Sequence, residues 1–257
     1  MDTMSSPDVA SPRAIGPADL NWALAQGWND FQQKRGDLIL LPFIYAVVGI
    51  LASAFAFQSS LFPLIFPLVG GFALIGPIAA VGFYELARRR ELGLEASWWH
   101  FLDPLQGRSR LPILILTVIL AGMFLLWMVV AQAVYTATLG TLAPATPAAF
   151  IAALLTTPQG WTMIVVGNLS GAVFAVLTLA ISAFSFPMVV DKSTEPFAAI
   201  AASVRAFRHN PGTMIGWGLR VAVILALGAV PLFIGLLVAM PVLGYATWHL
   251  YTRTFSR

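Results

Sequence analysis

Long apolar stretches separated by short charged segments dominate this chain. Asp, Glu, Lys and Arg are absent from 38–84 and from 111–190, and Arg220 is the one such residue in 210–252. A charge in hydrocarbon costs on the order of 3 kcal/mol, so this segregation is typical of a chain that crosses a bilayer. Each apolar stretch has room for two spans of about 20 residues. The pattern therefore predicts six crossings.

We predict an all-α membrane protein whose six transmembrane helices form three hairpins. The expected spans are 38–57, 62–85, 111–138, 161–186, 212–228 and 230–251. Residues 1–17 are polar and are expected to be a disordered tail, and 18–257 are expected to form one transmembrane domain. Between the third and fourth spans, three prolines interrupt an uncharged apolar segment that we expect to be a loop at the outer interface: Pro144, Pro147 and Pro158.

The charged segments also carry apolar residues at helical spacing. The first contains Leu20, Leu24, Trp28 and Phe31, the second contains Trp98, Phe101, Leu102 and Leu105, and the third contains Phe197, Ile200, Val204 and Phe207. Such periodicity predicts amphipathic helices that lie in the cytoplasmic headgroup plane with their aromatic rings in lipid. A protein-docking surface is the alternative interpretation of the same residues.

The distribution of basic residues predicts the orientation of the chain. Lys and Arg occur before the first span, in the second and fourth connections and after the last span, whereas the other three connections carry none. Under the positive-inside rule both termini are cytoplasmic. The leading segment lacks the apolar core of a cleavable signal peptide, so the first span is expected to direct insertion.

Composition narrows the classes of function. Apolar residues make up 59% of the chain and charged residues 10%, with a mean hydropathy of +0.84, which exceeds what a soluble domain tolerates. The absence of cysteine excludes disulfides, thiolate metal sites and iron–sulfur ligation. Although the net charge is +3, the basic residues lie at helix ends rather than in one patch, so we expect no nucleic-acid partner.

Few ionisable side chains are available for chemistry within the predicted spans. Glu85 and His249 lie at span ends, and no His, Asp or Glu lies deeper. A proton relay or haem ligation therefore lacks its residues. A metal site would need His100, His209 and His249 to converge with a carboxylate, and surface histidines are the simpler interpretation. We expect no enzyme activity, catalytic residue, metal or cofactor.

Arg220 is the most unusual residue, because it lies roughly 12 Å along the fifth span counted from Gly212. Its guanidinium is expected to snorkel to the cytoplasmic headgroups or to form an internal pair, with Glu85 as a candidate partner. An anion or lipid-headgroup site is the alternative. The candidate ligand or lipid contacts are Arg220, Glu85, His249 and Asn168.

Other polar and small residues within the predicted spans favour packing between helices. Asn168, Gln132 and Ser182 are expected to hydrogen-bond across helices, and the fourth span carries the GxxxG pair Gly167 and Gly171. The second and sixth spans share one spacing, Pro67, Gly71 and Pro77 against Pro231, Gly235 and Pro241. A duplicated hairpin and chance both explain this spacing. Broken helices that expose carbonyls to a ligand, as in transporters, are the alternative to simple packing.

Three strings resemble those of a proteobacterial family of predicted integral membrane proteins that carry a domain of unknown function. They are FPLVGGFALIGPIAAVGFYELARRRELG (66–93), SFPMVVDKSTEPFAAIAASVRAFRHNPGTMIGW (185–217) and MPVLGYATWHLYTR (240–253). The resemblance implies a multi-pass protein of the bacterial inner, or cytoplasmic, membrane. Some relatives are labelled as respiratory-oxidase subunit I, yet this sequence lacks the metal-ligating histidines of that role. An accessory position beside such a complex stays open.

Two functions fit these observations. The first is a non-catalytic accessory, assembly or organising subunit that binds membrane lipids and other membrane proteins, such as a respiratory complex. The alternative is a transporter or lipid-handling protein with a site near Arg220 and Glu85, which a wet cavity reaching Arg220 would favour. A dry, packed bundle would favour the first function. An enzyme would require four side chains to converge on one cytoplasmic pocket: Glu85, Trp99, His100 and His249.

Overall fold

The computed structural model describes residues 11–33, 76–144, 146–231 and 233–255, together with Val47, Ile50, 62–65, Pro67 and Leu68. Every regular element within these residues is a helix. Apart from Val47 and Ile50, the first predicted span lies outside the described residues, as do part of the second span and residues 1–10. The proposed repeat also includes Gly71, so it cannot be compared in full.

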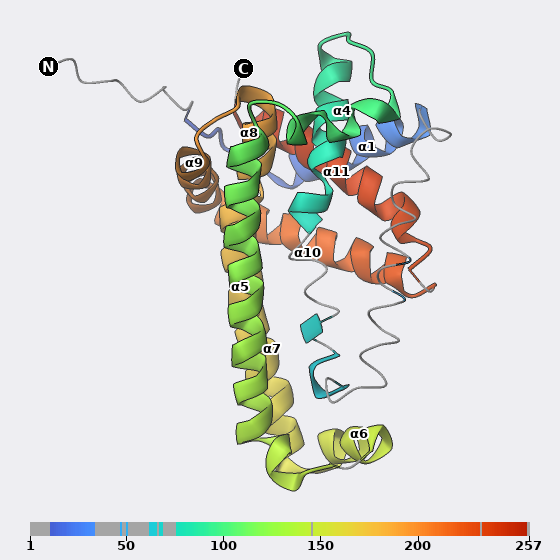
Figure 1. Cartoon of the computed structure of the whole chain (residues 1–257), viewed down its shortest axis with the longest axis vertical. Coiled ribbons are helices and arrows are strands. Elements are labelled where there is room, and N and C mark those ends of the chain that lie inside the picture. Colours follow the sequence, from blue (N-terminus) through green and yellow to red (C-terminus); the bar gives the residue numbers. More distant parts are fainter. Residues whose placement is uncertain are drawn as a thin grey trace, which may run out of the picture.

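Two long helices, α5 (Arg110–Ala137) and α7 (Pro158–Ser182), run side by side along the molecule (Figure 1). At one end they are joined by η3 (Leu139–Leu142) and α6 (Pro147–Thr156), and η1 (Phe62–Leu64) contacts α5. The segment predicted to be a loop therefore contains a helix. Thr146 caps it by accepting a hydrogen bond from Ala149 N at 3.1 Å, and Pro147 suits its first turn.

Three helical segments are long and apolar enough to cross a membrane: Arg110–Ala137, Pro158–Lys192 and Pro211–Ala229. They coincide with the third, fourth and fifth predicted spans. The second of them includes α7 and its continuation α8 (Ser185–Lys192), and the third is α10 (Pro211–Ala229). The helix of the sixth predicted span, α11 (Leu236–Thr254), begins later than expected because a turn with a positive φ of 64° at Phe233 precedes it.

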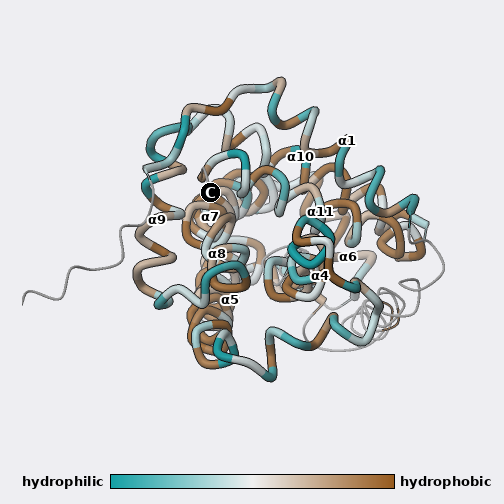
Figure 2. The backbone as a smooth tube through the Cα atoms, turned by 90° about the horizontal axis from the view of Figure 1, so that it is seen from above, coloured by the Kyte–Doolittle hydropathy of each residue, from teal (hydrophilic) through white to brown (hydrophobic). Residues whose placement is uncertain are grey.

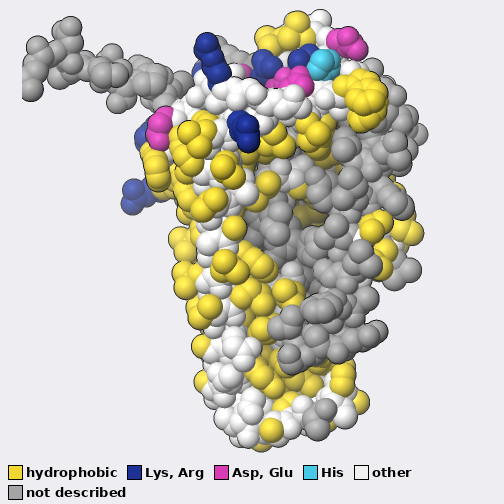
Figure 3. Space-filling model, viewed as in Figure 1, with side chains coloured by type: hydrophobic (Ala, Val, Ile, Leu, Met, Phe, Trp, Pro, Cys, Tyr) yellow, Lys and Arg dark blue, Asp and Glu magenta, His cyan; other side chains and the backbone are white. Residues whose placement is uncertain are grey.

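The remaining helices gather at the end of the molecule opposite α6, which we call the charged end (Figure 1). They are α1 (Pro17–Gln33), α4 (Val81–Glu91), η2 (Trp98–Leu105) and α9 (Pro196–His209). Of these, α1 and α4 pack against α11, whose Tyr245, Ala246 and Trp248 are fully buried. Figure 3 shows charged side chains collected at this end above a hydrophobic face, and Figure 2 shows hydrophilic stretches around α1, α4 and α9.

The helices α1 and α9 form where the helical spacing predicts them, yet both pack partly through small side chains. The buried positions are Leu20, Ala23, Gly27 and Phe31 in α1, and Pro196, Ala199, Ala202, Ser203 and Ala206 in α9. Small residues allow helix axes to approach closely. Two aromatic residues of the predicted apolar faces, Trp28 and Phe197, consequently remain exposed.

The segment before α1 is attached to the helices of the C-terminal half. Arg13 N donates to Thr254 O at 2.8 Å, and Ile15 N donates to Asn210 Oδ1 at 2.9 Å. Asn210 returns a hydrogen bond from Nδ2 to Arg13 O at 3.1 Å. Part of the stretch predicted to be a disordered tail is therefore held against α10 and α11, because its backbone groups find partners there.

Candidate functional site

Ion pairs join α1, α4 and α11 at the charged end. Asp30 Oδ2 of α1 lies 2.8 Å from Nε2 of His249 on α11, and Asp30 Oδ1 lies 3.0 Å from Nη1 of Arg90 on α4. The Arg90 guanidinium also lies over the Tyr245 ring, 5.4 Å from its centre. These contacts connect residues far apart in the sequence, so they fix the positions of three helices relative to one another.

Asp19 joins the start of α1 to the end of α11. Its carboxylate accepts a hydrogen bond from Gly16 N at 2.8 Å and pairs with Arg253, whose guanidinium lies 4.5 Å from the Trp22 ring centre. The hydrogen bond from Gly16, followed by that from Arg253, lowers the pKa of Asp19 below its ordinary value. The charged form of Asp19 is therefore the form that stabilises this junction.

We expect Asp19→Asn to lower thermal stability at neutral pH and to reduce the loss of stability in acid. The folded pKa of Asp19 lies below the unfolded one, so its contribution is present above the unfolded pKa and is lost as the pH falls through the folded pKa. Melting temperatures in mild detergent between about pH 7 and about pH 3 measure both effects. An acid slope equal to that of the wild type would contradict the assignment.

Glu85 of α4 is 4% exposed and is neutralised within its own helix. Its carboxylate accepts hydrogen bonds from Arg88 at 2.8 and 2.7 Å and from Arg89 at 2.9 Å. Arg89 also donates to Asp103 of η2 at 2.8 Å, and Asp103 Oδ2 lies 2.8 Å from His100 Nδ1. This series of charged contacts attaches η2 to α4.

The structure corrects the expectation that all three histidines lie on the surface. The His249 side chain is only 13% exposed because it packs between α1 and α4 beside Asp30. His100 is half-buried beside Asp103, and His209 is exposed at the end of α9. The histidines thus have separate surroundings, and no cluster suited to a metal ion occurs within the described ranges.

Arg220 and Glu85, which the sequence offered as a candidate pair, bind separate partners. Arg220 Nη1 donates to Gly216 O at 3.3 Å, and Nη2 donates to Asn21 Oδ1 of α1 at 3.4 Å, whereas Glu85 binds the arginines of its own helix. Local pairing succeeds because Arg88 and Arg89 lie three and four residues after Glu85, on the same helix face. Arg220 instead connects α10 to α1.

Two of the three polar residues predicted to bond across helices, Asn168 and Ser182, bond within their own helix. Asn168 and Ser182 donate to carbonyls four residues earlier in α7, at 2.8 and 2.7 Å. Gln132 is exposed on α5. A hydrogen bond between helices comes instead from Ser203 of α9, which donates to Ala180 O of α7 at 2.8 Å. Ser203 was not among the residues predicted from the sequence.

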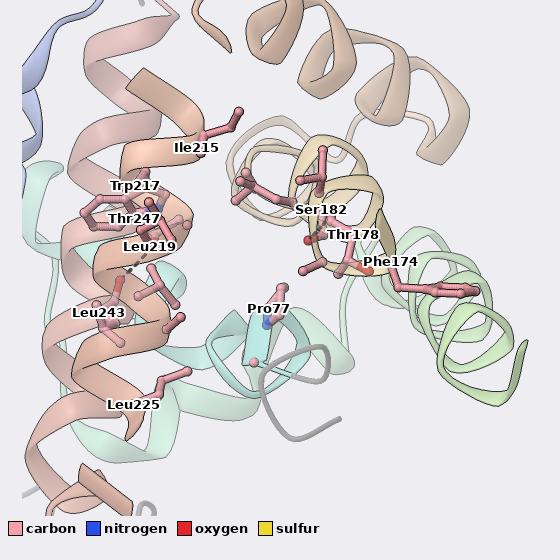
Figure 4. Close-up of a pocket in the computed structure, with 18 of the residues that line it drawn as sticks. Pro77, Phe174, Thr178, Ser182, Ile215, Trp217, Leu219, Leu225, Leu243 and Thr247 are labelled. Carbon is pink, nitrogen blue, oxygen red and sulfur yellow. Dashed lines mark hydrogen bonds between the residues drawn. The ribbon is translucent and has the colours of Figure 1, made fainter. Parts of the chain in front are cut away.

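A cavity of about 720 Å³ lies between α4, α7, α10 and α11 (Figure 4). Its volume falls in the range of roughly 300 to 1,000 Å³ that is typical of small-molecule sites. The lining is mostly apolar and includes Pro77, Trp127, Phe174, Trp217 and Leu243. No Asp, Glu, Lys, Arg or His lines it within the described part of the chain, so Arg220 does not reach it. The cavity can therefore hold an apolar, uncharged molecule.

Neutral polar side chains interrupt this apolar wall. The lining contains Tyr84, Asn168, Thr178, Ser182 and Thr247. Thr247 donates to Leu243 O at 2.7 Å, a hydrogen bond drawn in Figure 4. Of the predicted candidates, only Asn168 lines the cavity, while Arg220, Glu85 and His249 lie elsewhere.

Three wall residues were not predicted from the sequence: Thr178, Thr247 and Trp217. A signal for part of the wall was present in α7, where polar and small residues recur at alternating intervals of three and four: Asn168, Gly171, Ala175, Thr178 and Ser182. This spacing places them on one helix face. Trp217 and Thr247 carried no comparable signal, because their position depends on how α10 and α11 pack.

Comparison with known proteins gives one match. A family model described as "Predicted integral membrane protein (DUF2189)" matches residues 64–191, a range that includes α4, α5 and α7. No curated protein and no solved structure matches the chain.

Proposed function

Because the chain belongs to this family of predicted integral membrane proteins, we propose that it is a non-catalytic accessory, assembly or organising subunit of the bacterial cytoplasmic membrane. In this proposal the chain crosses the membrane six times as three hairpins. The apolar helical segments Arg110–Ala137, Pro158–Lys192 and Pro211–Ala229 account for three crossings. The sequence pattern supports the other three, at 38–57, 62–85 and 230–251.

The distribution of charge supports cytoplasmic termini. The start of α1 and the end of α11 both lie at the charged end, where Asp19 pairs with Arg253, and Asp30 of α1 pairs with Arg90 of α4. At the opposite end, the connection formed by η3 and α6 contains no Lys or Arg. The positive-inside rule assigns the charged end to the cytoplasm.

The observation that carries the accessory role is an exposed apolar cluster at the charged end, the η2 cluster. It consists of Leu92, Leu94, Trp98, Trp99, Leu102 and Leu105. The ring centres of Trp98 and Trp99 are 3.4 Å apart. The contacts of Arg89 with Glu85 and Asp103 hold the segment beneath them in place. Exposed apolar patches mark interaction sites, and tryptophan is enriched among the residues that dominate binding energy.

The proposed partners are membrane lipids along the apolar helices and another membrane protein, such as a respiratory complex, at the η2 cluster. The charged groups nearest the cluster are engaged in structural pairs, which supports binding rather than turnover. The alternative, a transporter or lipid-handling protein with a site near Arg220 and Glu85, gains no support from the geometry. These two residues have separate partners and neither lines the cavity.

Removal of one tryptophan tests the accessory role. Trp99 is 68% exposed in the η2 cluster, and Trp161 is 56% exposed at the start of α7, at the other end of the molecule. Trp99→Ala should reduce recovery of a stoichiometric protein partner about tenfold or more, because a central aromatic anchor is lost. The measurement is purification of the tagged protein, at native expression level in mild detergent, with mass spectrometry of copurifying proteins and lipids.

Trp161→Ala is the matched control. Retention of the partner by the wild type and by Trp161→Ala, with loss in Trp99→Ala, would support the proposal. Equal recovery in all three proteins would contradict a role for the η2 cluster. Purification with lipids alone would contradict the accessory function itself.

A further inference from the structure

Thr178 presents an unpaired hydroxyl to the apolar cavity. The residue is 5% exposed, and its Oγ1 has no hydrogen-bond partner among the described residues. Figure 4 shows its side chain on the cavity side of α7. Other helical threonines in the chain donate to the carbonyl four residues earlier, as Thr117, Thr247 and Thr254 do at 2.7 to 2.8 Å. Thr178 lacks this bond, so its donor is available to a molecule in the cavity.

Two more hydroxyls lie on the cavity wall. Ser182 donates to Thr178 O at 2.7 Å, whereas Thr247 donates to Leu243 O at 2.7 Å and also hydrogen-bonds the buried Tyr84. The oxygen of the Ser182 hydroxyl keeps its acceptor capacity. The wall therefore offers a donor at Thr178 and an acceptor at Ser182, both uncharged. A buried hydroxyl without a partner is costly, so a ligand oxygen bonded to Thr178 would be stabilising.

The cavity is shaped by one close helix contact and by small side chains. On Gly218 of α10, a Cβ atom would lie 2.8 Å from Leu179 Cδ2 of α7, so the two helices meet closely here. The lining from α7 includes the small residues Gly171, Ala172 and Ala175. Two further lining residues, Ile215 and Leu219, are exposed on the apolar surface. The cavity thus opens where hydrocarbon would surround the protein.

We propose that this cavity binds an uncharged, chain-like lipid whose hydroxyl or carbonyl oxygen accepts a hydrogen bond from Thr178. The apolar wall suits a hydrocarbon chain, and a charged headgroup would have no counter-charge among the described lining residues. An opening on the apolar surface admits a ligand from the bilayer. This site does not depend on the accessory function and lies away from the η2 cluster.

A long-chain alcohol brominated at mid-chain is a suitable probe, because bromine quenches tryptophan fluorescence on contact. Trp217 and Trp127 both line the cavity and are buried. Titration of the detergent-purified full chain gives the Kd, and the same titration of Trp217→Phe identifies the share of quenching that belongs to Trp217. A brominated alkane of equal length serves as the probe without a hydroxyl group.

Thr178→Val should weaken binding of the alcohol about 3- to 10-fold, the value of one hydrogen bond, and leave binding of the alkane unchanged. Without ligand the variant should melt at a higher temperature, because a buried unpaired hydroxyl has been removed. A misfolded variant would instead melt at a lower temperature and lose binding of the alkane too, so misfolding cannot produce the expected result. Thr162→Val, at an exposed position of the same helix, should match the wild type in both titrations.

Ala175→Phe tests the location of the site by filling the cavity. It should abolish the Trp217 quenching by the alcohol and by the alkane. Wild-type quenching in Ala175→Phe would overturn the proposal, because the probe would then bind elsewhere. Wild-type affinity of Thr178→Val for the alcohol would also overturn it, since the hydroxyl would then make no contact with the ligand.

Discussion

Gly27→Ala should detach α1 from α11 and lower the free energy of unfolding by about 2 to 3 kcal/mol. A Cβ atom at position 27 would lie 2.5 Å from Val242 O and 2.7 Å from Ala246 N. Both are backbone atoms of α11, so they cannot move aside as the end of a flexible side chain could. One methyl group therefore forces the two helices apart.

The separation would also weaken the ion pairs that depend on this contact. Asp30 would move away from His249, and Asp19 from Arg253. Two measurements follow the change in mild detergent: the melting temperature, and the rate of trypsin cleavage after Arg13. In the wild type Arg13 N donates to Thr254 O, which holds this part of the chain against α11. Cleavage should be faster in Gly27→Ala.

Gly122→Ala provides the matched control in α5. A Cβ atom at Gly122 would meet no atom within 4 Å, so the substitution adds helix propensity without a clash. It should stabilise the protein by about 0.5 to 1 kcal/mol. The two alanine substitutions should therefore change the free energy of unfolding in opposite directions. A similar effect of both would contradict the close contact between α1 and α11.

The sequence predicted the membrane character and the helical class because both follow directly from the properties of the lipid bilayer as a solvent. Charges are excluded from hydrocarbon, so their segregation is visible without knowledge of any contact. The family match confirms the predicted membership, and the helices at Arg110–Ala137, Pro158–Lys192 and Pro211–Ala229 agree with three predicted spans. The helix α6 was missed because three prolines resembled loop signals, although Thr146 and Pro147 also form a helix start.

Partners of the charged groups could not be predicted, because pairing depends on tertiary packing. Asp30 and His249 are 219 residues apart, and nothing in the sequence around either identifies the other. Glu85 was a candidate partner of Arg220, yet Glu85 pairs with arginines one turn away. Local pairs of this kind form readily on one helix face, and they leave a distant arginine to find another acceptor.

The cavity was only partly visible in the sequence. The small and polar residues of α7 repeat at helical intervals, which places Thr178 and Ser182 on one face. That pattern predicts close helix packing as readily as it predicts a cavity. Whether α7 packs closely or borders a cavity depends on how α10 meets α7 near Gly218. That contact forms only when the helices assemble.

Glu85→Gln should lower the free energy of unfolding by about 2 to 3 kcal/mol, because it removes the counter-charge of Arg88 and one of the two carboxylates that bind Arg89. Removal of one partner from a fully buried pair costs about 3 to 5 kcal/mol, and solvent reduces that cost here. The side chains of Arg88 and Arg89 are 24% and 19% exposed. The hydrogen bonds that Arg88 donates to Glu85 raise the pKa of Arg88 above its ordinary value, as expected when the pair stabilises the charged guanidinium.

Glu95→Gln is the control, since Glu95 is exposed in the connection between α4 and η2 and should change stability by less than about 0.5 kcal/mol. A double-mutant cycle with Arg88→Met then separates the ion pair from other effects. Once Arg88 is removed, Glu85→Gln no longer leaves Arg88 without its counter-charge, so the cost of Glu85→Gln should fall by about 1 to 2 kcal/mol. Additive losses would show instead that Glu85 and Arg88 stabilise the charged end independently, which would contradict a stabilising ion pair between them.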